Sequence, residues 1–150
     1  MDNQLKQTSE GLNHLIIIAN DGKEGYAQAA NHVGNLILKA VFTRNSATRA
    51  NFAEELSGLV IATGTEPESG TGPLGALHRV WIDIKTSFVS NNDQAVLKEC
   101  SRGDEAAVSA YHTVLNSNGL TDEQRNILEK QLKLTKDSLF SLQQELKTHV

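Results

Sequence analysis

The chain has 150 residues, and its 14 Lys and Arg against 18 Asp and Glu give a net charge of −4. We expect a single domain over residues 1–150, and the mild negative charge without a basic run argues against a nucleic-acid binder. The longest apolar run, Leu15 to Ala19, is too short to cross a membrane, and the one cysteine fits a reducing cytoplasm, so we expect a cytoplasmic protein.

Apolar residues recur every three or four positions through the first sixty residues, which is the period of an amphipathic helix. The spacing predicts one helix over Leu5–Val33, which Asp21 and Gly22 could interrupt because these residue types favour turns and helix ends. A second helix is predicted over Leu36–Thr63.

Glycine and proline concentrate in residues 64–73, which predicts the one long loop of the chain. A shorter amphipathic stretch then predicts a helix over Leu74–Ser90, with Trp81 as its apolar anchor. The next helix, Asp93–Ser117, has a seam of small residues. The last helix, Thr121–His149, opens with a capping box. No segment shows the alternation of a β-strand.

Four of the predicted helices have similar lengths, and the short one lies in the connection between the second and the third of them. Two helical hairpins joined by one long crossover are the arrangement of the ferritin-like bundles. The sequence therefore predicts an all-α, ferritin-like four-helix bundle with an additional helix in the long crossover between the second and third bundle helices.

Three segments resemble the hallmark segments of a known family: Asp21–Tyr26, Gly75–Lys85 and Glu99–Glu105. The family is an uncharacterised bacterial one, a domain of unknown function whose members are described as ferritin-like four-helix-bundle proteins. The likeness covers nearly the whole chain, and the family pattern has Glu where this chain has Asp104, which keeps the charge. The resemblance implies the fold and supplies no activity.

Ferritin-like di-iron centres use Glu-x-x-His pairs, because residues i and i+3 of a helix can both reach one metal pair. None of the five histidines has a Glu three positions before it. Arg49, in the apolar seam of the second helix, would also repel a metal ion. An irregular site for iron or another divalent metal stays open as an alternative, with its carboxylates drawn from Glu54, Glu55, Glu99 and Glu105.

We favour a structural interpretation of these charges, because a buried Arg must be paired. The expected partner of Arg49 is a carboxylate of the third bundle helix, Glu99 first and Glu105 second, with Tyr26 able to complete the network. His78 and Arg79 are expected to tie the crossover helix to the bundle by hydrogen bonds. The predicted structural polar network comprises Asp21, Arg49, Glu99, Glu105, His78 and Arg79.

The main functional hypothesis is a non-catalytic helical-bundle protein without a cofactor, associated with stress by analogy of fold alone. The alternative is a metal-binding ferritin-like protein, an oxidase or a metal-storage protein, with Glu55, Glu99 and Glu105 as an atypical carboxylate site. Several apolar residues outside the main seams predict self-association, most simply as a two-fold homodimer. These residues are Ile16, Ile17, Ile18, Val41, Val60 and Ile61.

Overall fold

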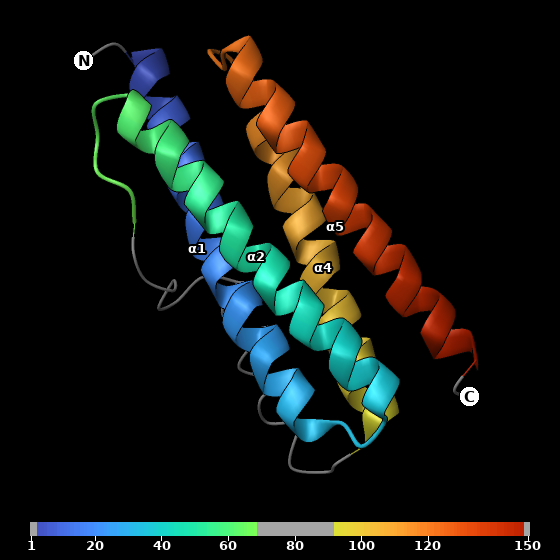
Figure 1. The fold of residues 1–150 in the computed structure, drawn as a ribbon. Helices are drawn as coiled ribbons and strands as arrows, with labels where there is room; N and C mark the ends of the chain where they lie inside the picture. Colours follow the sequence, from blue (N-terminus) through green and yellow to red (C-terminus); the bar gives the residue numbers. More distant parts are fainter. Residues whose placement is uncertain (1–2, 69–91, 149–150) are drawn as a thin grey trace.

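The computed structural model describes residues 3–68 and 92–148, and every regular element in these two ranges is a helix (Figure 1). No helix in these ranges combines the length and the apolar character needed to cross a membrane. The predicted all-helical fold is confirmed, whereas the predicted crossover helix Leu74–Ser90 falls outside the described residues. The helices are α1 (Asn3–His32), α2 (Leu36–Ala62), α4 (Asp93–Leu115) and α5 (Asp122–Thr148).

Side-chain caps define the starts of three helices. The Asn35 side chain accepts the backbone N–H groups of Ile37 and Leu38 at the start of α2, and Asn92 caps α4 in the same way. Before α5, the Thr121 hydroxyl accepts the N–H of Gln124 at 3.1 Å and the Gln124 side chain accepts the N–H of Thr121 at 2.8 Å. This reciprocal pair is the capping box that the sequence predicts.

Helix α1 runs without a break through Asp21 and Gly22. Gly22 lies against α2, where a Cβ atom on it would stand 3.3 Å from Cγ of Arg49. The glycine therefore allows α1 and α2 to approach closely, and it does not mark a turn.

Contacts at the two ends of the bundle show where α2 ends and where α4 begins. At one end, the backbone N–H groups of Gly34 and Asn35 donate to the carboxylate of Asp93 at 2.9 and 3.0 Å. At the other end, Ser9 of α1 lies 3.2 Å from the hydroxyl of Thr63, which follows α2. Helix α2 therefore ends at the opposite end of the bundle from the start of α4, so the connection between the hairpins joins the two ends (Figure 1).

Two buried apolar clusters fill the bundle, one toward each end, and polar side chains lie between them. The cluster nearer the start of α1 includes Leu12, Leu15, Phe52, Leu56, Tyr111 and Leu128. The cluster nearer the α1–α2 loop includes Tyr26, Leu38, Phe42, Leu97, Cys100 and Leu142. The middle of the bundle, where seams of apolar residues would be expected to meet, is thus where its charged groups are buried.

Candidate functional site

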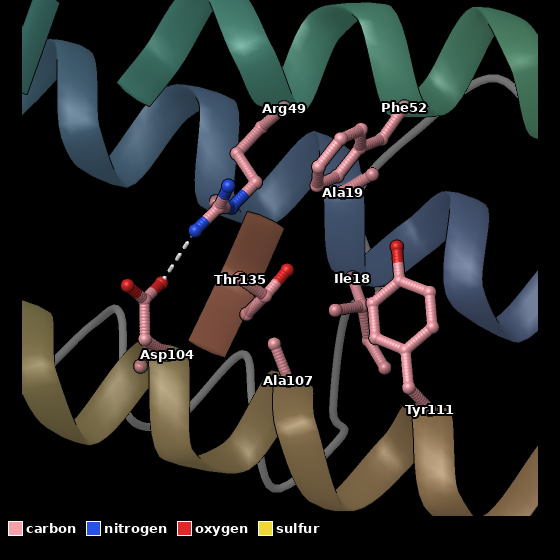
Figure 2. Close-up of a pocket in the computed structure, with 10 residues that line it drawn as sticks. Ile18, Ala19, Arg49, Phe52, Asp104, Ala107, Tyr111 and Thr135 are labelled. Atoms are coloured by element: carbon pink, nitrogen blue, oxygen red, sulfur yellow. Dashed lines mark hydrogen bonds and ion pairs between the residues drawn. The ribbon is translucent and has the colours of Figure 1, made fainter. Parts of the chain in front are cut away.

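A buried ion pair occupies the middle of the bundle. Nη2 of Arg49 on α2 lies 2.8 Å from Oδ1 of Asp104 on α4, and Figure 2 shows the two side chains pointing toward one another. Their side chains are only 5% and 2% exposed. Both charges have lost their hydration, so such a pair is stable only if further hydrogen bonds satisfy it.

The carboxylate of Asp104 receives hydrogen bonds from the other two helices as well. The Tyr26 hydroxyl of α1 and the Ser138 hydroxyl of α5 each donate to Oδ2 of Asp104 at 2.7 Å. Ser138 in turn accepts the side-chain N–H of Asn45 at 3.2 Å. All four described helices therefore contribute to one set of contacts, which we call the Asp104 network: Tyr26, Asn45, Arg49, Asp104 and Ser138.

Aromatic rings flank the guanidinium of Arg49. Its Cζ atom lies 5.5 Å from the ring centroid of Tyr26 and 5.3 Å from that of Phe52. A cation within about 6 Å of a ring centroid is attracted by the negative face of the ring. The charge of Arg49 is therefore compensated by a carboxylate and by two aromatic rings in the absence of bulk water.

The ionisable groups around Asp104 keep their neutral-pH charge states. Burial and the Asp104 carboxylate raise the pKa of Tyr26 well above its ordinary value. Burial disfavours the charged form of Arg49, but the Asp104 carboxylate, together with Tyr26 and Tyr111, outweighs it and the pKa of Arg49 is raised. Burial, Asp104 and Glu99 also raise the pKa of the Cys100 thiol. Neither the phenol nor the thiol is therefore poised to act as a base or nucleophile near neutral pH.

A second polar chain lies on the side of the ion pair toward the start of α1. The Tyr111 hydroxyl of α4 donates to Oε1 of Gln131 on α5 at 2.6 Å, and burial raises the pKa of Tyr111. Nε2 of Gln131 donates to the backbone oxygen of Phe52 at 3.4 Å and to Oε1 of Glu55 at 3.2 Å. This series of hydrogen bonds connects α4, α5 and α2 through neutral donors and one exposed carboxylate, that of Glu55.

A small cavity separates the Asp104 network from Tyr111 (Figure 2). Its volume is about 10 Å³, close to the room that a single water molecule needs. Arg49, Asp104 and Thr135 contribute polar atoms to its wall, and the rest of the wall is mostly apolar. The cavity can hold one hydrogen-bonded water and is too small for an organic substrate.

The expectation that Glu99 or Glu105 pairs with Arg49 is wrong. Glu99 accepts a hydrogen bond at 2.5 Å from Arg102, three residues along the same helix, and Glu105 is exposed. The rotation of α4 about its axis places the shorter Asp104 side chain toward α2 instead. The expectation that Tyr26 belongs to the network is confirmed.

The remaining members of the predicted network have different positions. Asp21 is buried on α1, whereas His78 and Arg79 fall outside the described residues. In residues 3–68 and 92–148, no three His, Cys, Asp or Glu side chains gather so that they could hold a metal ion. Glu55, Glu99 and Glu105, the carboxylates considered for an irregular metal site, therefore do not form such a group.

Four residues of these networks were missed by the sequence reasoning: Asp104, Tyr111, Gln131 and Ser138. A signal for the first two was present, because Cys100, Asp104, Ala107 and Tyr111 are spaced 4, 3 and 4 and share one helical face. That face carries the buried polar groups of α4. Gln131 and Ser138 had no such signal, because polar residues beside a leucine seam are ordinarily solvated.

The fold and this centre define an all-α helical-bundle protein in which a hydrogen-bonded ion pair occupies the middle of the core. The chain belongs to the DUF2383 family, a domain of unknown function, whose model matches residues 7–117. The matched region contains Tyr26, Arg49 and Asp104 and ends before α5. Among curated proteins, no sequence matches the chain. Membership in a family of unknown function, which the resemblance implied, is confirmed.

Proposed function

We propose that this protein is a non-catalytic bundle of the ferritin-like kind, in which the Arg49–Asp104 ion pair occupies the part of the core that di-iron proteins use for metal. The observation that carries the proposal is the guanidinium of Arg49 itself, buried at the centre and 2.8 Å from the carboxylate of Asp104. The ferritin-like assignment is supported by the order of two hairpins with a connection that joins opposite ends of the bundle.

Charge and hydrogen bonding both argue against metal at this position. Metal ligands of the di-iron proteins are inward-facing carboxylates and histidines, and a divalent cation beside Arg49 would be repelled by its fixed positive charge. Both oxygens of Asp104 already accept hydrogen bonds, from Arg49 on one and from Tyr26 and Ser138 on the other. These contacts suit a structural role, in which the network fixes how the four helices meet.

Elemental analysis of protein purified without chelator tests this proposal. We expect iron, manganese and zinc far below one ion per chain, and no oxidation of added Fe²⁺ faster than in buffer. Stoichiometric metal would overturn the proposal in favour of an oxidase or a metal-storage protein. In that case a Glu55→Gln, Glu99→Gln, Glu105→Gln triple variant would show whether those carboxylates hold the ion. A Glu10→Gln, Glu123→Gln, Glu129→Gln triple variant, at exposed glutamates outside the candidate metal site, would be its control.

The proposal includes a cytoplasmic homodimer with a role in stress, the latter by analogy of fold alone. Fewer apolar residues are available for a dimer interface than the sequence predicts, because Ile16, Ile18 and Val60 are buried within the chain. Exposed apolar side chains remain at Leu36 and Ile37, which are 80% and 71% exposed. Sedimentation equilibrium should give a dimer mass that Leu36→Ser, Ile37→Ser reduces to a monomer; a monomer of the natural chain would exclude the dimer.

A further inference from the structure

A groove follows the boundary between α2 and α5. Its volume is about 290 Å³, near the lower end of the range for small-molecule sites. Its wall contains few apolar side chains. The polar residues in the wall include Arg44, Asn45, Thr48, Arg49, Ser138 and Ser141.

Two buried polar side chains reach the groove with unused hydrogen-bonding capacity. Arg49 carries five N–H donors, and within the described part of the chain only Nη2 donates a hydrogen bond, to Asp104. Asn45 donates to Ser138, while its side-chain oxygen accepts nothing from the residues described. Both residues are more than nine-tenths buried. Buried polar groups are almost always satisfied, and both residues line the groove, so a molecule bound in the groove can supply partners to these groups.

The charge around the groove is positive although the whole chain is negative. Asp104 balances Arg49, and Asp137 at the groove wall is neutralised by Lys133 at 2.9 Å. Arg44 is exposed and forms no ion pair with any described residue, so its charge is left over. A groove with one excess positive charge and unused guanidinium donors favours an anion.

We propose that the α2–α5 groove binds a small oxyanion, a carboxylate or phosphate group that lies between Arg44 and Arg49. Arg49 donates to the anion from the floor of the groove, and Arg44 supplies the uncompensated charge at its mouth. The hydroxyls of Thr48 and Ser141 are further partners at the wall. Because Ser138 connects the groove to Asp104, an occupied groove would also hold α5 more firmly against α2.

Nitrogen-15 NMR titrations with sodium acetate and with sodium phosphate test this inference, using sodium chloride at equal ionic strength as the reference for screening. Saturable shifts are expected for Nε–H of Arg49 and the side-chain amide of Asn45, with acetate or phosphate and not with chloride. The anion that saturates identifies the source of the oxyanion chemistry. Shifts that increase linearly, or that chloride reproduces, overturn the proposal.

Two variants test whether the anion binds in the groove, and neither of them changes the Arg49–Asp104 ion pair. Arg44→Gln removes the excess charge, and Ser141→Leu fills the groove from an exposed position. Each should weaken binding at least about tenfold, since a hydrogen bond to a charged group is lost or blocked. Arg102→Gln, the same change on α4 at a residue that does not line the groove, should leave binding unchanged. Equal binding in all three variants, or equal loss in all three, overturns the proposal.

Discussion

Gly22 of α1 and Arg49 of α2 lie in close contact, so that a Cβ atom at residue 22 would stand 3.3 Å from Cγ and 3.5 Å from Cδ of Arg49. The arginine stem has little freedom to move, because Asp104 and two aromatic rings hold its guanidinium. The glycine therefore sets the distance between the two helices at the level of the ion pair.

Replacing Gly58 of α2 and Gly22 of α1 with alanine should have different effects on stability. Gly58→Ala, at an exposed position of α2 with no atom near its added Cβ, should stabilise the protein by about 0.5–1 kcal/mol through helix propensity. Gly22→Ala should lose that gain or be destabilising, because its Cβ presses on the fixed arginine. Urea unfolding followed by circular dichroism gives both values. An equal gain at the two sites would mean that the contact at Gly22 is not restrictive.

The ion pair should behave as a coupled unit. Arg49→Met and Asp104→Asn should each reduce the free energy of unfolding by about 3–5 kcal/mol, because each leaves the other group buried without its partner. The double variant should lose clearly less than the sum of the two. As a control, the partly exposed Glu99–Arg102 pair, removed by Glu99→Gln and Arg102→Gln, should show a coupling below about 1 kcal/mol. Additive losses at Arg49 and Asp104 would contradict their interaction.

The two tyrosines of the chain should resist ionisation while the protein is folded. Burial, with Asp104 in the case of Tyr26, raises the pKa of both phenols. A raised folded pKa means that the stabilising contribution is complete below the unfolded pKa of about 10 and is lost as pH rises above it. Tyrosinate absorbance should therefore appear only together with the loss of helical circular dichroism. A titration near pH 10 that leaves the helices intact would show that the phenols are accessible.

The protein should tolerate removal of both partners of the Tyr111–Gln131 hydrogen bond better than removal of one. Gln131→Leu leaves the buried Tyr111 hydroxyl without its acceptor, which should cost about 1–3 kcal/mol. Adding Tyr111→Phe removes the orphaned hydroxyl and should restore part of the stability. Thermal or urea unfolding of the single and double variants measures this. A double variant less stable than Gln131→Leu alone would show that the hydroxyl has another role.

The four helices and most of their limits could be predicted from the sequence, because the signals involved are local. The predicted helices end within two residues of the observed ones where both ends are described: Leu36–Thr63 against Leu36–Ala62, and Asp93–Ser117 against Asp93–Leu115. Caps such as Asn35 and Thr121 act over three residues, and the apolar period of three to four belongs to one helix. The burial of Arg49 followed from the same period.

Which carboxylate meets Arg49 was decided only by the tertiary structure. Glu99, Asp104 and Glu105 all lie within two turns of α4, and the choice among them depends on the rotation of α4 and on its axial offset from α2. Packing of small residues against neighbouring helices sets both quantities, and no interval within a single helix encodes them. The same holds for Ser138 of α5, which reaches Asp104 from a position 34 residues further along the chain. Helices arise from contacts three or four residues apart, whereas the Asp104 network forms only when four separate helices meet.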